Sequence, residues 1–419
     1  MANLAGDFKF GIEQFGPAFS RPDTACVSYG LPFQDACLKH AIHTFNSSRI
    51  FVIASRALTQ NSDALERLQK ALGDRLVGVR VGISPHTPWS DCLKTLKAIE
   101  EASADTLITL GAGSLTDGAK MIRFALANSA NSIAELETLW GGKRTQNPKL
   151  RANIRQSTMP LICVPTSLSG AEYQALAGAT DPVSRRKRGF EPAEMPDLVV
   201  LDPELCLTTP AAVWLSTGVR AIDHCVETLC APSCDAAAAE STTRGLQRLV
   251  SGLLKTASDP HDLTARINCQ LGVIDAMSGR ATGVPLGASH GISHALGPLG
   301  VGHGETSCIL LAPVCKFNAS KGANLEQQRK VAATLMSLPL VQKALALRPE
   351  SGDHSDLGHI LDVVIDALSM PRTLRDVGIG RDDLDLLAKH SLEDPWCKAN
   401  PFPLTTVEQV LEILEMIVE

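Results

Sequence analysis

Between residues 48 and 202, short apolar runs alternate with amphipathic segments, and this alternation constrains the fold more than any other feature of the chain. Four runs have the length and composition of buried strands: 49–54, 76–81, 106–110 and 161–164. Three segments have the periodicity of helices: 61–72, 89–102 and 116–127. Strands that alternate with helices predict a parallel sheet covered by helices, so we expect an α/β domain here.

Two more strands are predicted in the same region, at 175–181 and 198–201. A polar loop between them carries the basic sequence 184–188, which would suit either a nucleic-acid patch or a solvated turn. The solvated turn is the favoured interpretation.

The pattern of apolar residues changes after Asp202 and Pro203. Strand patterns are no longer found, and helical periodicity continues to Glu419. A chain of 419 residues also exceeds the size of most single cores. We therefore predict an α/β domain over 1–204 and an all-helical domain over 205–419. Thr209 and Pro210 are expected to form the cap and first turn of the opening helix, and 405–418 is expected to be a core-facing helix.

Charge and cysteine content exclude several classes of protein. The formal net charge is −6, from 39 Lys and Arg and 45 Asp and Glu, so nucleic acid and anionic lipid are not expected partners. No run approaches the ~20 apolar residues of a membrane helix, and the pattern of residues 1–10 does not predict secretion. The 12 cysteines show no repeated CxxC and suggest reduced thiols. A cytoplasmic protein with a small-molecule partner is expected.

A glycine-rich loop follows the strand at 106–110 and leads into a helix. Gly111 and Gly113 would let the backbone approach a pyrophosphate, and the amino end of the helix favours an anion. The turn alone is a weak signal, because an ordinary connection between a strand and a helix has the same composition.

A second loop of small hydroxyl residues follows the strand at 161–164. The hydroxyls of Thr166, Ser167 and Ser169 could donate to phosphate or ribose oxygens, or could simply cap the loop. Two such loops together favour a nucleotide site.

Four histidines lie within about 80 residues of the helical region: His224, His290, His294 and His303. Positions 290 and 294 are four residues apart, so they share one face of a helix. Each histidine alone is commonly structural, but four together suggest either a metal site or acid–base chemistry.

The ten residues 111–120 resemble the GGGSxxDxxK signature of the iron-containing alcohol dehydrogenase family, matched at Gly111, Gly113, Ser114, Asp117 and Lys120. The second loop resembles the PTTxxxGSE loop of the same family and includes Glu172. The tail at 399–405 is similar to the family ending NPRPLT, with Phe402 in place of Arg. The resemblance implies a dehydroquinate synthase-like fold, in which a nicotinamide-dinucleotide domain precedes a helical catalytic domain, and a homodimer.

The resemblance also bears on the metal. Metal-dependent members bind a divalent cation through one Asp and three His, and His224, His290 and His303 fall at the three histidine positions. Arg220 occupies the Asp position, and a guanidinium would repel the cation. Asp223 lies about 100° away around the helix and does not replace the missing ligand. The maleylacetate reductase branch also lacks this Asp, so we predict no metal ligands and a site without metal.

The choice of dinucleotide is predicted from the end of the first strand. NAD-specific members carry an Asp there, whereas this chain has Ser55 and Arg56, so the carboxylate that would repel a 2′-phosphate is absent. The chain is expected to use NAD or NADP. The predicted cofactor-binding residues are Ser55, Gly111, Gly113, Ser114, Asp117, Thr166, Ser167 and Ser169.

The predicted reaction is reduction of a ketone, aldehyde or enone such as a maleylacetate-like compound, or oxidation of the matching alcohol. His294 or His303 would donate the proton, and Arg220 would stabilise the oxyanion or pair with a substrate carboxylate. The predicted catalytic residues are Arg220, His224, His290, His294 and His303. Phe402 weakens the case for maleylacetate itself. Three alternatives remain: a metal-dependent alcohol dehydrogenase, a dehydroquinate synthase-like lyase or cyclase, and a nucleotide-binding protein that has lost catalysis.

Overall fold

The computed structural model describes residues 8–84, 87–140, 154–184, 187–191, 194–348 and 356–419. The chain divides into two compact units, Met1–Thr209 and Pro210–Glu419. This division falls five residues after the boundary expected from the sequence, because the connection after the last strand continues as a short 3-10 helix, Leu205–Thr208, packed in unit 1.

Unit 1 contains a seven-stranded sheet with the order β1-β2-β9-β6-β5-β3-β4, in which β1 is antiparallel and the other neighbours are parallel. Its strands are β1 Gln14–Pro17, β2 Cys26–Tyr29, β3 Ile50–Ala54, β4 Leu76–Val81, β5 Thr106–Gly111, β6 Leu161–Pro165 and β9 Leu198–Leu201. The four apolar runs and the final run predicted as strands are therefore confirmed. The central strands β3, β5, β6 and β9 are completely buried, as expected for a sheet covered on both faces.

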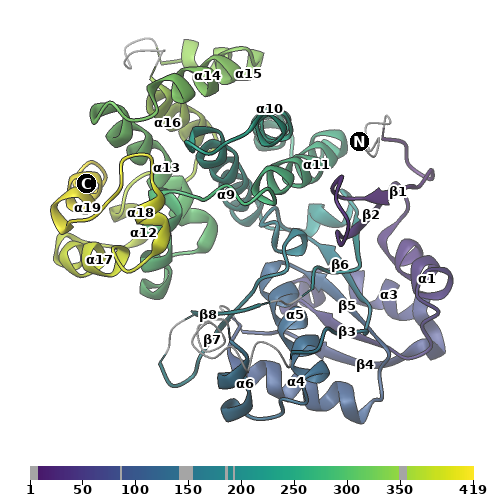
Figure 1. Cartoon of the computed structure of the whole chain (residues 1–419). Helices are drawn as coiled ribbons and strands as arrows, with labels where there is room; N and C mark the ends of the chain where they lie inside the picture. The colour runs from purple at the N-terminus through teal and green to yellow at the C-terminus, as the bar shows by residue number, and fades with distance from the viewer. Residues whose placement is uncertain (1–7, 85–86, 141–153, 185–186, 192–193, 349–355) are drawn as a thin grey trace. The chain divides into compact units, whose positions relative to one another are not determined.

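Helices cover both faces of this sheet (Figure 1). The helices are α1 Phe33–His43, α2 Arg56–Asn61, α3 Ala64–Leu72, α4 Trp89–Glu101, α5 Gly113–Ala127 and α6 Ile133–Leu139. Alternate residues of β3 show how the two faces differ: Val52 packs in one core with α1 and α3, whereas Ile53 packs in another with α4 and α5. The expected doubly covered α/β architecture is confirmed.

A small antiparallel hairpin, β7 Ala177–Thr180 and β8 Lys187–Phe190, lies outside the main sheet. The sequence predicted the first of these strands but treated 184–188 as a solvated turn, which is wrong for its last two residues. Lys187 and Arg188 pair with Thr180 and Ala179. A strand of four residues with two cations has no apolar run to reveal it.

Unit 2 consists of helices and contains no strand among its described residues. Its α-helices are α9 Ala211–Cys230, α10 Ala236–Ser258, α11 Leu263–Arg280, α12 Ala288–Leu296, α13 His303–Ser320, α14 Leu325–Met336, α15 Pro339–Ala346, α16 Leu357–Ala367, α17 Leu384–Ser391, α18 Pro395–Ala399 and α19 Val407–Leu414. A second, helical part of the chain is therefore confirmed. The closing helix is shorter than predicted, and Thr406 caps it.

The predicted cap of α9 is wrong. Pro210, rather than Thr209, occupies the capping position, and the helix starts at Ala211. The Thr209 hydroxyl instead donates to the carbonyl oxygen of Thr166 at 2.7 Å within unit 1. Thr209 therefore supports the second loop rather than the helix that follows it.

The cysteines are free thiols, and most of them are buried. Cys26 of unit 1 and Cys234 of unit 2 are partly exposed. Burial raises the pKa of both thiols, and the neighbouring carboxylates of Asp197 and Asp235 raise them further. None of the helices in the described ranges is both long enough and apolar enough to cross a membrane.

Candidate functional site

The glycine-rich loop lies at the carboxyl end of β5, where Gly111 ends the strand and α5 begins at Gly113. Gly111 has a φ of +146°, and a Cβ there would lie 2.7 Å from the Cβ of Ser55 and 2.8 Å from a methyl of Leu115. Only glycine fits this turn without displacing its neighbours. The tight turn places the amino end of a 15-residue helix at the end of a parallel strand, which is the geometry of an anion site.

The second loop packs against the first. A Cβ on Gly113 would lie 2.7 Å from the hydroxyl oxygen of Ser169, so the two loops touch where that side chain is missing. The backbone N–H of Thr166 donates to the Gly111 carbonyl at 3.4 Å, and the Ser167 hydroxyl donates to the Ser169 hydroxyl at 3.3 Å. The structure thus brings both predicted loops to one place in unit 1.

Two other predicted cofactor residues have structural partners. Asp117 forms an ion pair at 2.9 Å with buried Lys120, whose ammonium also donates to carbonyl oxygens of the segment 171–176. Ser55 caps α2 by accepting from the backbone N–H of Leu58. Ser114 is exposed in the first turn of α5.

Glu172, in the short segment that follows the second loop, is buried in unit 1. Burial raises the pKa of its carboxyl to about 7, although the nearby Lys120 ammonium favours the charged form. One of its oxygens has no hydrogen-bond partner within the described part of the chain. A carboxyl poised near neutrality beside the loops is a feature that the sequence signature did not reveal.

In unit 2, one face of α9 carries four titratable side chains: Arg220, Asp223, His224 and Glu227. The last three lie three, four and seven residues after Arg220, so the four side chains lie on adjacent turns of a single helix. Arg220, Asp223 and Glu227 are buried, whereas His224 is partly buried. Buried charges of this kind require partners, and α12 and α13 supply them.

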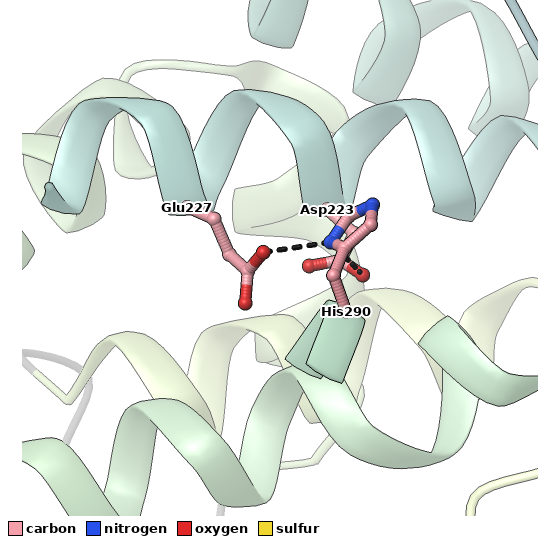
Figure 2. Close-up of side chains that lie close together, drawn as sticks. All are labelled: Asp223, Glu227 and His290. Carbon is pink, nitrogen blue, oxygen red and sulfur yellow. Dashed lines mark hydrogen bonds and ion pairs between the residues drawn. The ribbon is translucent and has the colours of Figure 1, made fainter. Parts of the chain in front are cut away.

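His290 of α12 is held by two carboxyl groups of α9 (Figure 2). Its Nδ1 lies 2.7 Å from a carboxyl oxygen of Glu227 and 3.4 Å from one of Asp223. Its Nε2 is buried and has no hydrogen-bond partner in the described ranges. The His290 ring also stacks on His224, with ring centres 4.6 Å apart.

Glu227 also closes the amino end of α12. Its two carboxyl oxygens accept the backbone N–H groups of Gly287 and Ser289, each at 2.9 Å. The side-chain oxygen of Asn400 accepts the N–H of Ala288 at 3.1 Å. The first N–H groups of a helix lack partners within it, so Glu227 and Asn400 act together as its cap. This gives the Asn of the tail motif a structural role.

Arg220 is buried between α9 and α13. Its guanidinium donates to the Ser307 hydroxyl at 3.1 Å, and that hydroxyl donates to Asp223 at 2.6 Å. The Ser289 hydroxyl donates to the same Asp223 oxygen at 2.9 Å. A fixed positive charge therefore lies within a polar network that links three helices.

Burial and mutual repulsion set the protonation of this cluster. Burial raises the pKa of Glu227 to about 7 and the pKa of Asp223 well above its ordinary value, and the charge of Glu227 adds to the latter shift. Burial lowers the pKa of His224 and His290 well below 6.5, and the charge of Arg220 contributes to both shifts. Both imidazoles are therefore neutral at pH 7.

His294 and His303 form a second, more exposed pair. Their rings are nearly parallel, with centres 6.1 Å apart. Nδ1 of His294 lies 2.8 Å from a carboxyl oxygen of Asp394, and 41% of the His294 side chain is exposed. Asp394 also caps α18, so its carboxylate is fixed in place. A histidine oriented by a carboxylate and open to solvent can exchange protons.

Asp223, Glu227 and Asp394 were not predicted as partners of the histidines. Glu227 and Asp394 are separated from their histidines by 63 and 100 residues, so no local pattern links them. Asp223 and Glu227 are four residues apart on the face that carries His224, and this spacing is the signal that could have identified them.

Family models match both units. Residues 33–203 match the model described as iron-containing alcohol dehydrogenase, and residues 214–418 match the C-terminal model of the Fe-containing alcohol dehydrogenase family. The chain belongs to the iron-containing alcohol dehydrogenase family. It is therefore an enzyme, an NAD(P)-dependent oxidoreductase that acts on alcohols or carbonyls, and its substrate is a small molecule.

Relatives of this family member include dehydrogenase FUM7 of Gibberella moniliformis, which is 38% identical over 421 residues, 96% of this chain and 98% of the relative. Dehydrogenase ALT3 of Alternaria alternata is 36% identical over 392 residues, 88% of this chain and 99% of the relative. The crystal structure of maleylacetate reductase from Agrobacterium tumefaciens has the same fold, with a TM-score of 0.71 at 23% identity, covering 97% of this chain and 98% of that chain.

The family name implies iron, so the donor groups must be tested against a divalent cation. The lone pair at Nε2 of His290 would suit a metal, and one oxygen or nitrogen from each of Asp223, Glu227 and His290 lie within 4.8 Å of one another. However, Nδ1 of His290 is already bound to Glu227, and one oxygen of Asp223 already accepts two serine hydroxyls. The buried guanidinium of Arg220 adds a positive charge. On electrostatic grounds this set fits a divalent cation poorly.

Proposed function

We propose that this protein reduces a carbonyl group with NADH or NADPH, or oxidises the matching alcohol, and does so without a metal. The carbonyl would belong to a ketone, an aldehyde or an enone such as a maleylacetate-like compound. The observation that carries the proposal is the buried Arg220, fixed by Ser307 in the cluster that contains His224 and His290.

Arg220 would perform the electrostatic role of the cation. Hydride transfer to a carbonyl carbon places negative charge on oxygen, and a charged donor fixed in advance stabilises that charge without reorganisation. A guanidinium remains protonated even when burial lowers its pKa, and burial does lower the pKa of Arg220. The same group could pair with a substrate carboxylate, which would give preference to acidic substrates.

His294 or His303 would supply the proton that completes the alcohol. The low pKa of His224 and His290 leaves those rings neutral, so they are poor proton donors at pH 7. His294 and His303 are exposed, and His294 has a fixed carboxylate beside it. The division of roles is that the buried pair orients the bound ligand and the exposed pair moves the proton.

Unit 1 would hold the dinucleotide at its two loops, with the pyrophosphate at the amino end of α5. Arg56 is exposed and lies at the carboxyl end of β3, with its side chain against Gly82 after β4. A cation there tolerates a 2′-phosphate, so we expect the values of kcat/KM for NADH and NADPH to differ by less than about 100-fold. Homodimer formation is also part of the proposal.

The test is an assay of metal-stripped protein. We would treat it with a chelator and follow oxidation of NADH and NADPH with maleylacetate and a panel of aldehydes, with and without Fe²⁺ or Zn²⁺. We expect activity to survive stripping. Arg220→Gln should lower kcat by about 10²- to 10³-fold, the usual effect of removing an oxyanion donor, whereas Arg329→Gln, at an exposed position of α14, should have no effect.

Activity only in the presence of metal would contradict the metal-free proposal. It would favour a metal-dependent alcohol dehydrogenase, for which the proximity of Asp223, Glu227 and His290 is the supporting observation. Conversion of substrate without net oxidation of the nicotinamide would favour a lyase or cyclase.

A further inference from the structure

Glu227 contacts His290 in a way that fixes the position of a proton. Nδ1 of His290 faces two carboxyl oxygens, one from Glu227 at 2.7 Å and one from Asp223 at 3.4 Å. The Asp223 oxygen already accepts two serine hydroxyls, and the Glu227 oxygens accept two backbone N–H groups, so both face Nδ1 as acceptors. Nδ1 then carries the hydrogen, and the neutral ring has a lone pair at Nε2. The tautomer of His290 is thus set by its neighbours on α9.

The other contacts of Glu227 keep it an acceptor. Its oxygens already accept hydrogen bonds from the backbone N–H groups of Gly287 and Ser289. These N–H groups are donors in either protonation state of Glu227. Two backbone N–H donors directed at one carboxyl group favour the carboxylate. A protonated Glu227 would have to donate to Nδ1 while two N–H groups still pointed at it.

The second ring nitrogen of His290 has no partner among the described residues. Nε2 is buried without a hydrogen-bond partner in the described part of unit 2, although burial of an unpaired polar atom is costly. The ring cannot turn freely, because Nδ1 is held and the face stacks on His224. The lone pair therefore has a fixed direction.

We propose that Glu227 is a positioning residue that holds His290 as the Nδ1–H tautomer, so that Nε2 accepts a hydrogen bond from a hydroxyl group of the bound ligand. The role assigned to the ligand rests on the proposed function, whereas the tautomer does not. On this proposal His290 accepts a hydrogen bond, and the proton donor of the reaction is a different histidine.

The direct test uses the wild-type protein labelled with ¹⁵N-histidine, at pH 8, after treatment with chelator. Two-bond proton–nitrogen correlation spectra distinguish the two tautomers, and a His290→Gln variant assigns the signals. We expect an unprotonated Nε2 in His290. A protonated Nε2 would overturn the proposal, whatever the activity of the enzyme.

Variants give an independent measurement. Glu227→Gln retains one side-chain oxygen, and its NH₂ group takes the place of the other. The NH₂ group must therefore face at least one N–H donor, with which it cannot form a hydrogen bond. We expect kcat/KM to fall about 10- to 100-fold, the usual effect of losing such a partner, a change in the His290 signals, and an unchanged Kd for NADH. The control is Glu412→Gln, which removes an exposed partner of Lys321. Full activity with unchanged His290 signals in Glu227→Gln would contradict the proposal.

The two proposals can fail separately. If no carbonyl is reduced but Nε2 of His290 is unprotonated, the tautomer assignment holds and the proposed reaction is wrong. If carbonyls are reduced but Nε2 carries the proton, the reaction holds and the role of Glu227 is wrong.

Discussion

At the scale of single residues, exposure distinguishes His294 from His290, because both rings are oriented by carboxyl groups but only the His290 ring is buried. Asp394 fixes one nitrogen of His294 and leaves the rest of the exposed ring to exchange protons. We predict that His294→Asn and His303→Asn each lower kcat by about 10²-fold, within the range for loss of a general acid. Steady-state kinetics with NADH would measure this.

The control for both variants is His261→Asn, at an exposed position between α10 and α11. Full turnover in both His294→Asn and His303→Asn would remove the proposed proton donors. A loss confined to one of them would identify the donor.

The proximity of the two predicted loops could be predicted from the sequence. The two glycines and the hydroxyls of the second loop lie together in unit 1, because each loop ends a strand of the same parallel sheet. The partners of the histidines were not predictable, because they come from residues distant in the sequence. The hydrogen bonds of Glu227 to α12, for example, form only after folding.

At the scale of elements, α12 depends on a close approach to α18. A Cβ added to Gly291 would lie 2.5 Å from the sulfur of Cys397 and 2.9 Å from its backbone nitrogen. We predict that Gly291→Ala lowers the free energy of unfolding by about 1–3 kcal/mol, as overpacking does. Activity should also fall, because His290 and His294 lie on the same helix.

Gly297, at the end of α12, offers a matched control. A Cβ there meets nothing within 4 Å, and its φ of −53° suits any residue. Gly297→Ala should therefore retain stability in urea denaturation. Equal stability of the two variants would show that the α12–α18 contact can relax.

The elements predicted well were those with a strong periodic pattern. Helix 89–102 was correct to within one residue, because its apolar positions repeat along one buried face. The segment 61–72 was less accurate, since the helix begins only at Ala64 and a separate short helix, Arg56–Asn61, precedes it. Thr209 is a residue type that is favoured at helix caps, but its hydroxyl donates to the carbonyl oxygen of Thr166 instead.

At the scale of the whole molecule, pH should act on stability through buried carboxyl groups. Glu172 has a folded-state pKa of about 7, raised by burial from 4.5. Between these values the unfolded chain releases the proton while the folded chain keeps it, so stability falls as pH rises from about 4.5 to 7. The loss from this group is at most about 3 kcal/mol, and it is constant above that range.

The prediction is therefore that Glu172→Gln gains stability relative to wild type between pH 4.5 and pH 8. Urea denaturation at several pH values would measure the difference. Glu100→Gln, at an exposed position of α4, should follow the wild-type profile. A constant difference between Glu172→Gln and wild type would show that folding does not raise the pKa of Glu172.

The distribution of thiols makes the protein suitable for optical measurement. Cys26 and Cys234 are the partly exposed cysteines of the described chain, and each unit carries one of them. Because burial protects the other ten from maleimides, a donor and an acceptor dye could be attached without cysteine deletions. The raised pKa of both thiols calls for labelling at mildly alkaline pH. Energy transfer between the dyes would then report, in single molecules, whether the two units move when NADH binds.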